Sequence, residues 1–594
     1  MSASASVPGG AAAPMQAVSL RAIAIACALM PLMAMWIVQA ELIWYSSHST
    51  AISLFYHVTF VVLVLSLGNL ALARWRPTWA LAPAEILVVY VMLSVGGTLV
   101  SHDFGQILVP MLAYPVQAAT PQNRWEDILL PHIREWSIVQ DLDAARYLGI
   151  GNWSMYDRSV LAAWAPPLLF WGVFILALMG ALMALNTFFR QPWTEKERLS
   201  FPIIKIPLMI CTGLPSLLRD RLFWIAFALA GGIDFWNNLA HLNPSLPDIP
   251  VVRVFLFSEY LETPPWNAIG LTEINLYPFV IGLAFFLPLD LAFSCWFFFI
   301  LFKVQQVVSA AIGMRELPGA PYHNEQAAGA YLSLGLLAAW LSRRHLVAVG
   351  RRVLGLPGGA DESAEPMPYR ASVALFVVCS AILVGCGMAL GASMGMMLLF
   401  FAFFFLYSLA IARMRAELGP PAHDLHNMGP DMLIANAVGT ENLDRGNLAV
   451  FTQFFFFNRA YRAHVSAHAM EGFKIAQLQR LSSRSMLGAT GIAVVVGLLS
   501  AYWALLHGSY VHGYSVSPAG QGFMREAWIR AEAWINNPTG PMVPNTVAAV
   551  IGLVVALVLG ALRMGLAWWP LHPVGYATCT SWTMEKLWAC VLIA

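Results

Sequence analysis

Uninterrupted apolar stretches dominate this chain and recur along most of its length. Many are about twenty residues long, the length that a helix needs to cross a bilayer, whereas barrel strands would alternate apolar and polar residues over about ten positions. Stretches long enough to span lie near residues 19–44, 50–73, 84–100, 164–189, 222–241, 276–312, 326–342, 370–391, 393–413, 485–507 and 543–563. The pattern predicts an all-α, polytopic membrane protein with about 12 to 16 membrane segments, broken and re-entrant helices included.

Basic residues beside the apolar stretches predict which ends lie in the cytoplasm. Arg74 and Arg76 place the end of the second span there, which makes residues 119–160 an extracytoplasmic excursion. Later basic residues expected to mark the cytoplasm are Arg413, Arg415, Arg459, Arg462, Lys474, Arg480 and Arg484. The intervening stretch 430–458 is polar in its middle, so we predict a hairpin or a re-entrant element there.

Residues 1–18 are small and polar and predict a disordered, cytoplasmic tail before an uncleaved first span. A cluster of four arginines precedes residues 356–368, which read as a cytoplasmic linker. This linker divides a first membrane half, residues 19–355, from a second, residues 369–594, and the two are possible related halves. The sequence stops within an apolar stretch, which leaves open that the natural protein continues beyond Ala594.

Composition narrows the class of protein further. With 59% hydrophobic and 11% charged residues the chain is not an ordinary soluble domain, and its net charge of +1 argues against a nucleic-acid partner. The seven cysteines lie mostly in apolar stretches without a CxxC pair, so we expect buried thiols rather than disulfides or a cysteine-based zinc site. No P-loop, Rossmann or GxSxG pattern appears, and we expect no cofactor.

Two apolar stretches look interrupted inside the membrane. Pro288 removes a backbone donor from residues 276–312, and Asp290 adds a charge, so we predict a broken helix. In the third span a glycine pair precedes His102 and Asp103, which permits close packing or unwinding. Because a charge at membrane depth costs about 3 kcal/mol, such residues persist where they pair, meet water or function.

Two further acids lie in apolar surroundings. Asp234 precedes Asn237 and Asn238 and follows two glycines, which predicts an unwound segment that lines a polar cavity. The alternative is a structural cap near the membrane surface. Glu41 lies just before two aromatic residues, and we interpret it as part of an interfacial belt.

Histidines and acids gather near the second group of basic residues. His464, His468 and Glu471 share one helical face, and a neighbouring group consists of His423, Asp424 and His426. Together they form a possible divalent-metal site, although the HExxH pattern of a metalloprotease is absent. We favour the alternative, a solvated cytoplasmic face, and predict no metal.

The segment ERLSFPIIKIP, residues 197–207, resembles an element that follows a span in the oligopeptide transporter superfamily, and more closely in its uncharacterised bacterial relatives. Three further places agree: GLAFFLPLDLAFSCWFF, ARMRAELGPP followed by HDLH, and WPLHPVGYA. The agreement is spread over about residues 165–594. The NPG and KIPPR motifs of many members are missing, which puts peptide specificity in doubt.

The resemblance implies a proton-coupled importer of oligopeptides or metal chelates, built from two related halves. It implies that Asp290 and Asp234 line the path or carry the coupling proton. The cytoplasmic gate contacts that it implies are Glu195, Glu197, Arg198, Arg415 and Glu417. ERLSFP and RAELGPP would then be equivalent positions in the two halves.

We therefore predict an ion-coupled secondary transporter in the bacterial inner membrane, with the bilayer and a small solute as partners. It is not expected to be an enzyme, and homo-oligomerisation is left open. One alternative is an enzyme acting on a lipid-linked substrate, with His102, Asp103 and the 119–160 excursion as its site. The other is a non-catalytic membrane scaffold. A polar cavity containing Asp290 or Asp234 would favour the transporter.

Overall fold

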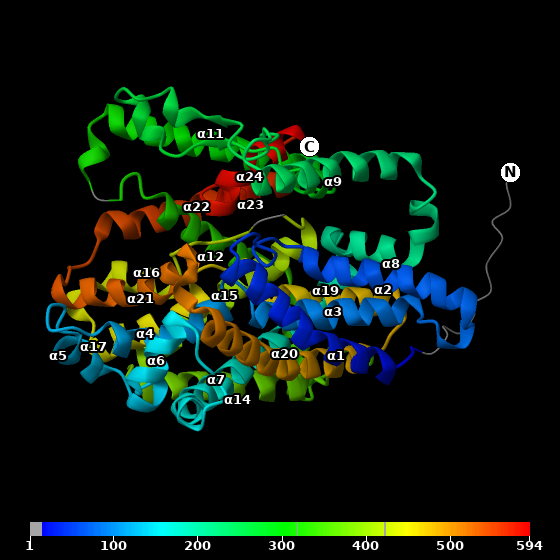
Figure 1. The fold of residues 1–594 in the computed structure, drawn as a ribbon, viewed down its shortest axis with the longest axis horizontal. Helices are drawn as coiled ribbons and strands as arrows, with labels where there is room; N and C mark the ends of the chain where they lie inside the picture. Colours follow the sequence, from blue (N-terminus) through cyan, green and yellow to red (C-terminus); the bar gives the residue numbers. More distant parts are fainter. Residues whose placement is uncertain (1–14, 318, 421–422) are drawn as a thin grey trace.

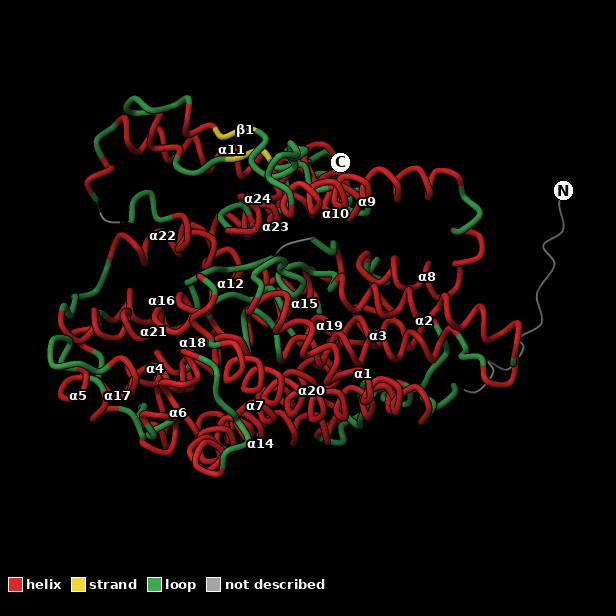
Figure 2. The backbone as a smooth tube through the Cα atoms, viewed as in Figure 1, coloured by secondary structure: helices red, strands yellow, loops and turns green. Residues whose placement is uncertain are grey.

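The computed structural model describes residues 15–317, 319–420 and 423–594, so most of the predicted tail at residues 1–18 lies outside the described residues. Regular structure in these ranges is almost entirely helical, as predicted (Figure 2). Two short strands, β1 (Phe255–Leu256) and β2 (Glu273–Ile274), pair in an antiparallel manner beside α11 (Leu289–Ala311).

Nine helical segments within the described ranges are long and apolar enough to cross a membrane. They are α1 (Leu20–Ile37) with its π-helical extension η1 (Val38–Ile43), α2 (Tyr56–Trp75), α3 (Pro83–Leu99), α7 (Arg158–Gln191), α11, α14 (Tyr369–Leu390), α15 (Met394–Glu417), α20 (Ser483–His512) and α22 (Val543–Gly565). The pair α8 (Lys205–Leu217) and α9 (Arg221–Leu242), bent by 116°, gives a tenth if counted as one span. The chain is thus a polytopic helical membrane protein.

The remaining helices are shorter or more polar than these spans. The predicted number of 12 to 16 membrane segments included broken and re-entrant helices, which belong to this group. They are α4 (Gly105–Ala118), α5 (Trp125–Ile128), α6 (Leu142–Ile150), α10 (Pro278–Ala284), α12 (His323–Leu341), α13 (Arg343–Val353), α16 (Pro430–Val438), α17 (Arg445–Gln453), α18 (Phe455–Asn458), α19 (Val465–Leu478), α21 (Pro518–Asn536), α23 (Pro573–Thr578) and α24 (Trp582–Ile593).

Polar caps set where several helices begin. The Ser19 hydroxyl accepts the Ala22 N–H at 3.2 Å at the start of α1, and Ser393 caps α15 in the same way. Pro288 immediately precedes α11, while α10 ends at Ala284, so the predicted break in this stretch is confirmed. The break before Asp290 follows from the backbone donor that proline lacks.

Helices from both sides of the 356–368 linker pack against one another (Figure 1). α1 and α3 pack with α20, α7 packs along α14, and α12 lies along α22. α11 contacts α23 and α24 in the upper layer of the view. The regions before and after the linker therefore form one interleaved helical assembly, most of whose buried residues belong to a single hydrophobic core.

α9 differs from the sequence expectation. It is continuous from Arg221 to Leu242, so the predicted unwinding at Asp234 is wrong. Asp234 is exposed, and the side chains of Asn237 and Asn238 bond to backbone atoms of Ile249 and Asp234. In apolar surroundings a helix keeps its internal hydrogen bonds even where glycine weakens it, because the backbone has no other partners.

Candidate functional site

Non-helical segments from distant parts of the chain meet inside the assembly. They are residues 44–55 before α2, 100–104 between α3 and α4, 418–429 between α15 and α16 with 421 and 422 outside the described residues, and 459–464 before α19. The His102 N–H donates to Thr50 Oγ1 at 3.0 Å, and Ser53 Oγ donates to the Pro420 carbonyl at 2.5 Å. Irregular backbone at membrane depth occurs where protein buries it or a cavity adjoins it.

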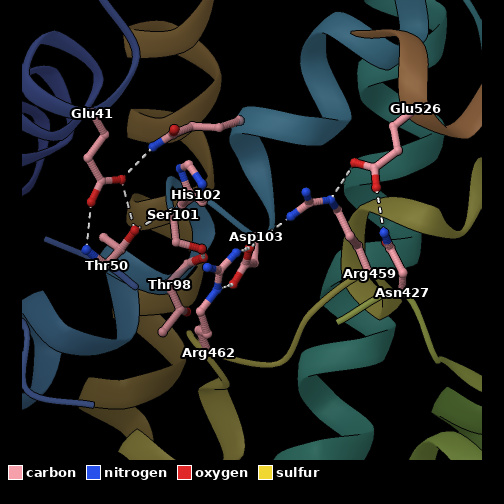
Figure 3. A network of polar contacts seen from close by, with 11 residues as sticks. Glu41, Thr50, Thr98, Ser101, His102, Asp103, Asn427, Arg459, Arg462 and Glu526 are labelled. Carbon is pink, nitrogen blue, oxygen red and sulfur yellow. Dashed lines mark hydrogen bonds and ion pairs between the residues drawn. The ribbon is translucent and has the colours of Figure 1, made fainter. Parts of the chain in front are cut away.

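An ion-pair network joins three of these segments to α21 (Figure 3). Asp103 binds Arg462 through two hydrogen bonds of 2.5 and 2.6 Å, and the side chains are 2% and 4% exposed. Arg459 lies 3.7 Å from the same carboxylate and donates to Glu526 at 2.8 Å, while Asn427 donates to Glu526 at 2.7 Å. Such charge-assisted, bidentate contacts fix geometry strongly.

Glu41 holds the neighbouring segment 44–55 in place. Its carboxylate accepts hydrogen bonds from Ser49 Oγ, from the N–H and Oγ1 of Thr50, and from Gln106 Nε2, at 2.6 to 2.9 Å. Figure 3 shows the contacts between Glu41 and Thr50. Glu41 is completely buried, so its predicted place in an interfacial belt is wrong. Trp44 and Tyr45 are exposed, whereas the carboxylate of Glu41 turns inward to the donors that satisfy it.

A second buried ion pair joins α15 to α19. Arg415 donates to both carboxylate oxygens of Glu471 at 2.7 and 2.8 Å and to His468 Nε2 at 3.1 Å. His464 Nε2 lies 3.1 Å from Ser408 Oγ. These side chains are buried, so the predicted solvated face is wrong. Within the described ranges no three or more histidine, cysteine or acidic side chains are grouped so that they could hold a metal ion.

Three arginines that we expected to mark the cytoplasm lie in the protein interior. Arg415, Arg459 and Arg462 are at most 8% exposed, and each is paired with an acid. The positive-inside rule applies to residues at the membrane surface, so these three carry no information on topology.

Several buried polar groups near the ion pairs have no hydrogen-bond partner among the residues that the structure describes. They include both ring nitrogens of His57, both ring nitrogens of His423 and both carboxylate oxygens of Asp424, and each residue is 1% exposed. Leaving a buried donor or acceptor unpaired costs about 1–3 kcal/mol. Residues retained at that cost are candidates for binding a proton or a ligand.

Two of the residues predicted to form a gate meet at one arginine. Arg413 pairs with Glu197 at 2.6 Å and with Glu417 at 2.7 Å. The resemblance placed both acids in one gate, whereas Arg413 was taken only as a topology marker. Arg415, placed in the same gate by the resemblance, instead pairs with Glu471.

The two motifs that carry these acids also contact each other through the backbone. The Phe201 N–H donates to the Ala416 carbonyl at 2.9 Å, and Ser200 Oγ donates to the Glu417 carbonyl at 2.7 Å. The final residue of RAELGPP, Pro421, lies outside the described residues. ERLSFP and RAELGP therefore contact each other directly, and we call these two contacting segments the clasp.

The remaining gate candidates lie at the end of α7. Glu195 pairs with Arg190 at 2.8 Å, and Arg190 also binds Glu365 of the linker through two hydrogen bonds of 2.8 Å. Arg198 is exposed, and its backbone is left-handed with a φ of 52°. The linker is therefore anchored to the first half by a buried ion pair.

His345 in α13 should make stability depend on pH near this anchor. Its ring is 5% exposed, and Nδ1 accepts from Lys196 Nζ at 3.2 Å. Burial, with Lys196 and Arg190 nearby, lowers the pKa of His345 from 6.5 to about 4. The neutral ring therefore contributes stability above pH 6.5, which is lost as pH falls from 6.5 towards 4.

As the pH falls from 6.5 towards 4, we expect the thermal stability of His345→Gln to decrease less than that of the unmodified protein. Thermal unfolding in detergent, followed by tryptophan fluorescence, measures both. Parallel stability curves for the two proteins would contradict the assignment.

Asp290 lies at the edge of a separate cavity. It pairs with Arg563 of α22. Arg563 lines a cavity of about 250 Å³ between α12, α15, α22 and α23, together with Arg413, Glu417 and His572. Neither Asp290 nor Asp234 is among the residues that line this cavity: Asp290 adjoins it only through Arg563, and Asp234 is exposed on α9.

A wider groove of about 580 Å³ runs over α21. Glu526 and Arg530 line it, and Arg530 pairs with the buried Asp431 at 2.7 Å. Through Glu526 and Arg459 the groove is connected to Asp103 by consecutive ion pairs. The alternative enzyme site would need His102 and the charged residues of the 119–160 excursion to share one cleft. His102 packs on Phe523 of α21, whereas the Arg124–Asp127 pair of the excursion is 68% exposed on both sides.

Comparison with known proteins gives one result for the chain as a whole. A family described as a family of unknown function (DUF6785) matches residues 12–594. A search of curated proteins found no match.

Proposed function

We propose that this chain, which belongs to the DUF6785 family of unknown function, is an ion-coupled secondary transporter of a small solute. The observation that carries the proposal is the buried polar centre where four non-helical segments meet, with Asp103 and Arg462 at its middle. Discontinuous helices that meet at a polar site are the architecture of many secondary transporters. Ionisable residues inside such assemblies mark ion paths and proton relays.

Openings near two parts of this centre support the proposal. The groove over α21 leads to Asp103 through Glu526 and Arg459. The smaller cavity is lined by Arg413 and Glu417, which hold the clasp between ERLSFP and RAELGP. An alternating-access transporter needs a site that each side can reach in turn, and a clasp of ion pairs is suited to control one of these routes.

The finer assignments also belong to this proposal. We take the proton as the coupling ion, a bacterial inner membrane as the location with the N-terminus in the cytoplasm, and an oligopeptide or a metal chelate as the solute. Asp103 replaces Asp290 and Asp234 as the central acid, because Asp103 is buried, whereas Asp234 is exposed and Asp290 is partly exposed beside Arg563.

Uptake into liposomes containing the purified protein tests the proposal. Under an imposed inward proton gradient, labelled trialanine or ferric citrate should accumulate, and Asp103→Asn should reduce accumulation to the level of protein-free liposomes. Asp127→Asn, an exposed acid, is the matched control. Accumulation of neither probe, or gradient-driven uptake that Asp103→Asn leaves unchanged, would contradict the proposal.

A further inference from the structure

Arg462 lies near two carboxylates but is bound to only one. Asp103 takes both hydrogen bonds of its guanidinium at 2.5 and 2.6 Å. Asp424 interacts electrostatically with the same guanidinium, yet within the described ranges no arginine or lysine forms an ion pair with it. Asp424 is 1% exposed, with the hydroxyls of Ser581 and Thr583 beside it.

Carboxylates outnumber arginines in this network. The acids that interact with Arg459 or Arg462 are Glu41, Asp103, Asp424 and Glu526. Glu41 accepts hydrogen bonds from Ser49, Thr50 and Gln106. Glu526 is 30% exposed at the groove and can be solvated, and Asp103 is paired. An uncompensated carboxylate in a buried site neutralises itself by taking a proton, because removing its charge from water costs several kcal/mol. Asp424 is the carboxylate left without compensation.

From this arrangement we propose that Asp424 is the group that binds the coupling proton, and that its ionisation moves Arg462 from Asp103 to Asp424. The inference rests on the proposed function and deepens it by naming the ion and the residue. In the state described here, Asp424 carries the proton on a carboxyl oxygen and Arg462 is bound to Asp103. When the proton passes to water, Asp424 regains its negative charge and competes for Arg462.

The exchange would need only a local movement of the Arg462 guanidinium. The guanidinium of Arg462 lies 5.8 Å from the ring of Trp582, which belongs to the same helix start as Ser581 and Thr583. A shift towards Asp424 is therefore a shift towards side chains already nearby. The charged or titratable groups that face Asp424 are Arg462 and Asp103, from two non-helical segments, and Tyr331 of α12.

Release of Asp103 from Arg462 would affect the groove over α21 through the ion pairs that connect the two. Asp103 is tied to Arg459, which binds Glu526 in the groove, and the adjacent His102 N–H is bound to Thr50. Freeing Asp103 from Arg462 loosens residues 100–104, where α3 gives way to α4. Protonation of Asp424 would thus set whether the polar centre is held closed or open to the groove.

Infrared difference spectroscopy of the full chain in nanodiscs tests this inference without measuring transport. Raising the pH should remove a C=O band of a protonated carboxylic acid, and the band should be missing in Asp424→Asn. Asp103→Asn should shift loss of the band to lower pH, because Arg462 is then free to stabilise ionised Asp424. Asp127→Asn should leave the band unchanged.

Each outcome decides the inference. A band that persists unchanged in Asp424→Asn overturns it, as does removal of the band by sodium ions at constant pH, which would identify a sodium site. An unchanged titration in Asp103→Asn overturns the exchange of Arg462. If the band behaves as expected while no probe enters the liposomes, the transport proposal fails and the proton site stands. If gradient-driven uptake occurs but the carboxylic acid band is not seen, the transport proposal stands and Asp424 is ruled out as the proton-binding group.

Discussion

Replacing Arg415 by alanine should destabilise the folded protein by about 3–5 kcal/mol, because the change leaves Glu471 buried without its partner. The Arg415 and Glu471 side chains are 0% and 2% exposed, so water cannot take over the role of the guanidinium. Neighbouring His468, whose Nδ1 lies 3.6 Å from the Glu471 carboxylate, also loses the hydrogen bond that it accepts from Arg415. The free energy of unfolding in mixed detergent micelles, from denaturant titration, measures the effect.

Two further variants separate the lost ion pair from the lost side-chain volume. Arg415→Leu combined with Glu471→Leu should recover much of the stability, because removing both charges of a buried pair is often neutral. Arg124→Ala, which breaks a pair 68% exposed on both sides, should cost less than about 1 kcal/mol. Equal losses for Arg415→Ala and Arg124→Ala would show that the Arg415 pair is not desolvated in the protein.

Helix positions and breaks were predictable because they depend on neighbouring residues. An apolar run of spanning length predicts a helix in the membrane, and Pro288 breaks one because it lacks a backbone donor. The glycine pair before His102 left close packing and unwinding both open, and it lies within α3, which ends at Leu99. The same local reasoning failed at Asp234, where a glycine pair and three polar side chains sit in an unbroken helix.

The ion pairs of the site were not predictable, because they join residues far apart in the sequence. Asp103 and Arg462 are 359 positions apart, and Arg190 and Glu365 are 175 apart. A basic residue beside an apolar stretch can lie at the membrane surface or inside the protein, and Arg462 shows the second case. One signal was available: Arg459 and Arg462 follow closely on a run of four phenylalanines.

Adding a single methyl group at Gly329 should separate α12 from α22. A Cβ atom at Gly329 would lie 1.8 Å from the Ala549 carbonyl oxygen, and one at Gly552 would lie 1.9 Å from the Gln326 carbonyl oxygen. Both obstacles are backbone atoms, which a rotamer change cannot move. We expect Gly329→Ala to cost about 3 kcal/mol, the upper part of the range for overpacked cores, measured by unfolding in the same micelles.

Gly488→Ala in α20 is the matched control, because a Cβ there meets nothing within 4 Å. Alanine favours a helix over glycine by up to about 1 kcal/mol, so this variant should be neutral or more stable. Gly329→Ala should also change the shape of the smaller cavity, because α12 and α22 form two of its walls. Helix α22 also carries Arg563, the partner of Asp290. Two equally stable variants would mean that α12 and α22 do not approach this closely in the membrane.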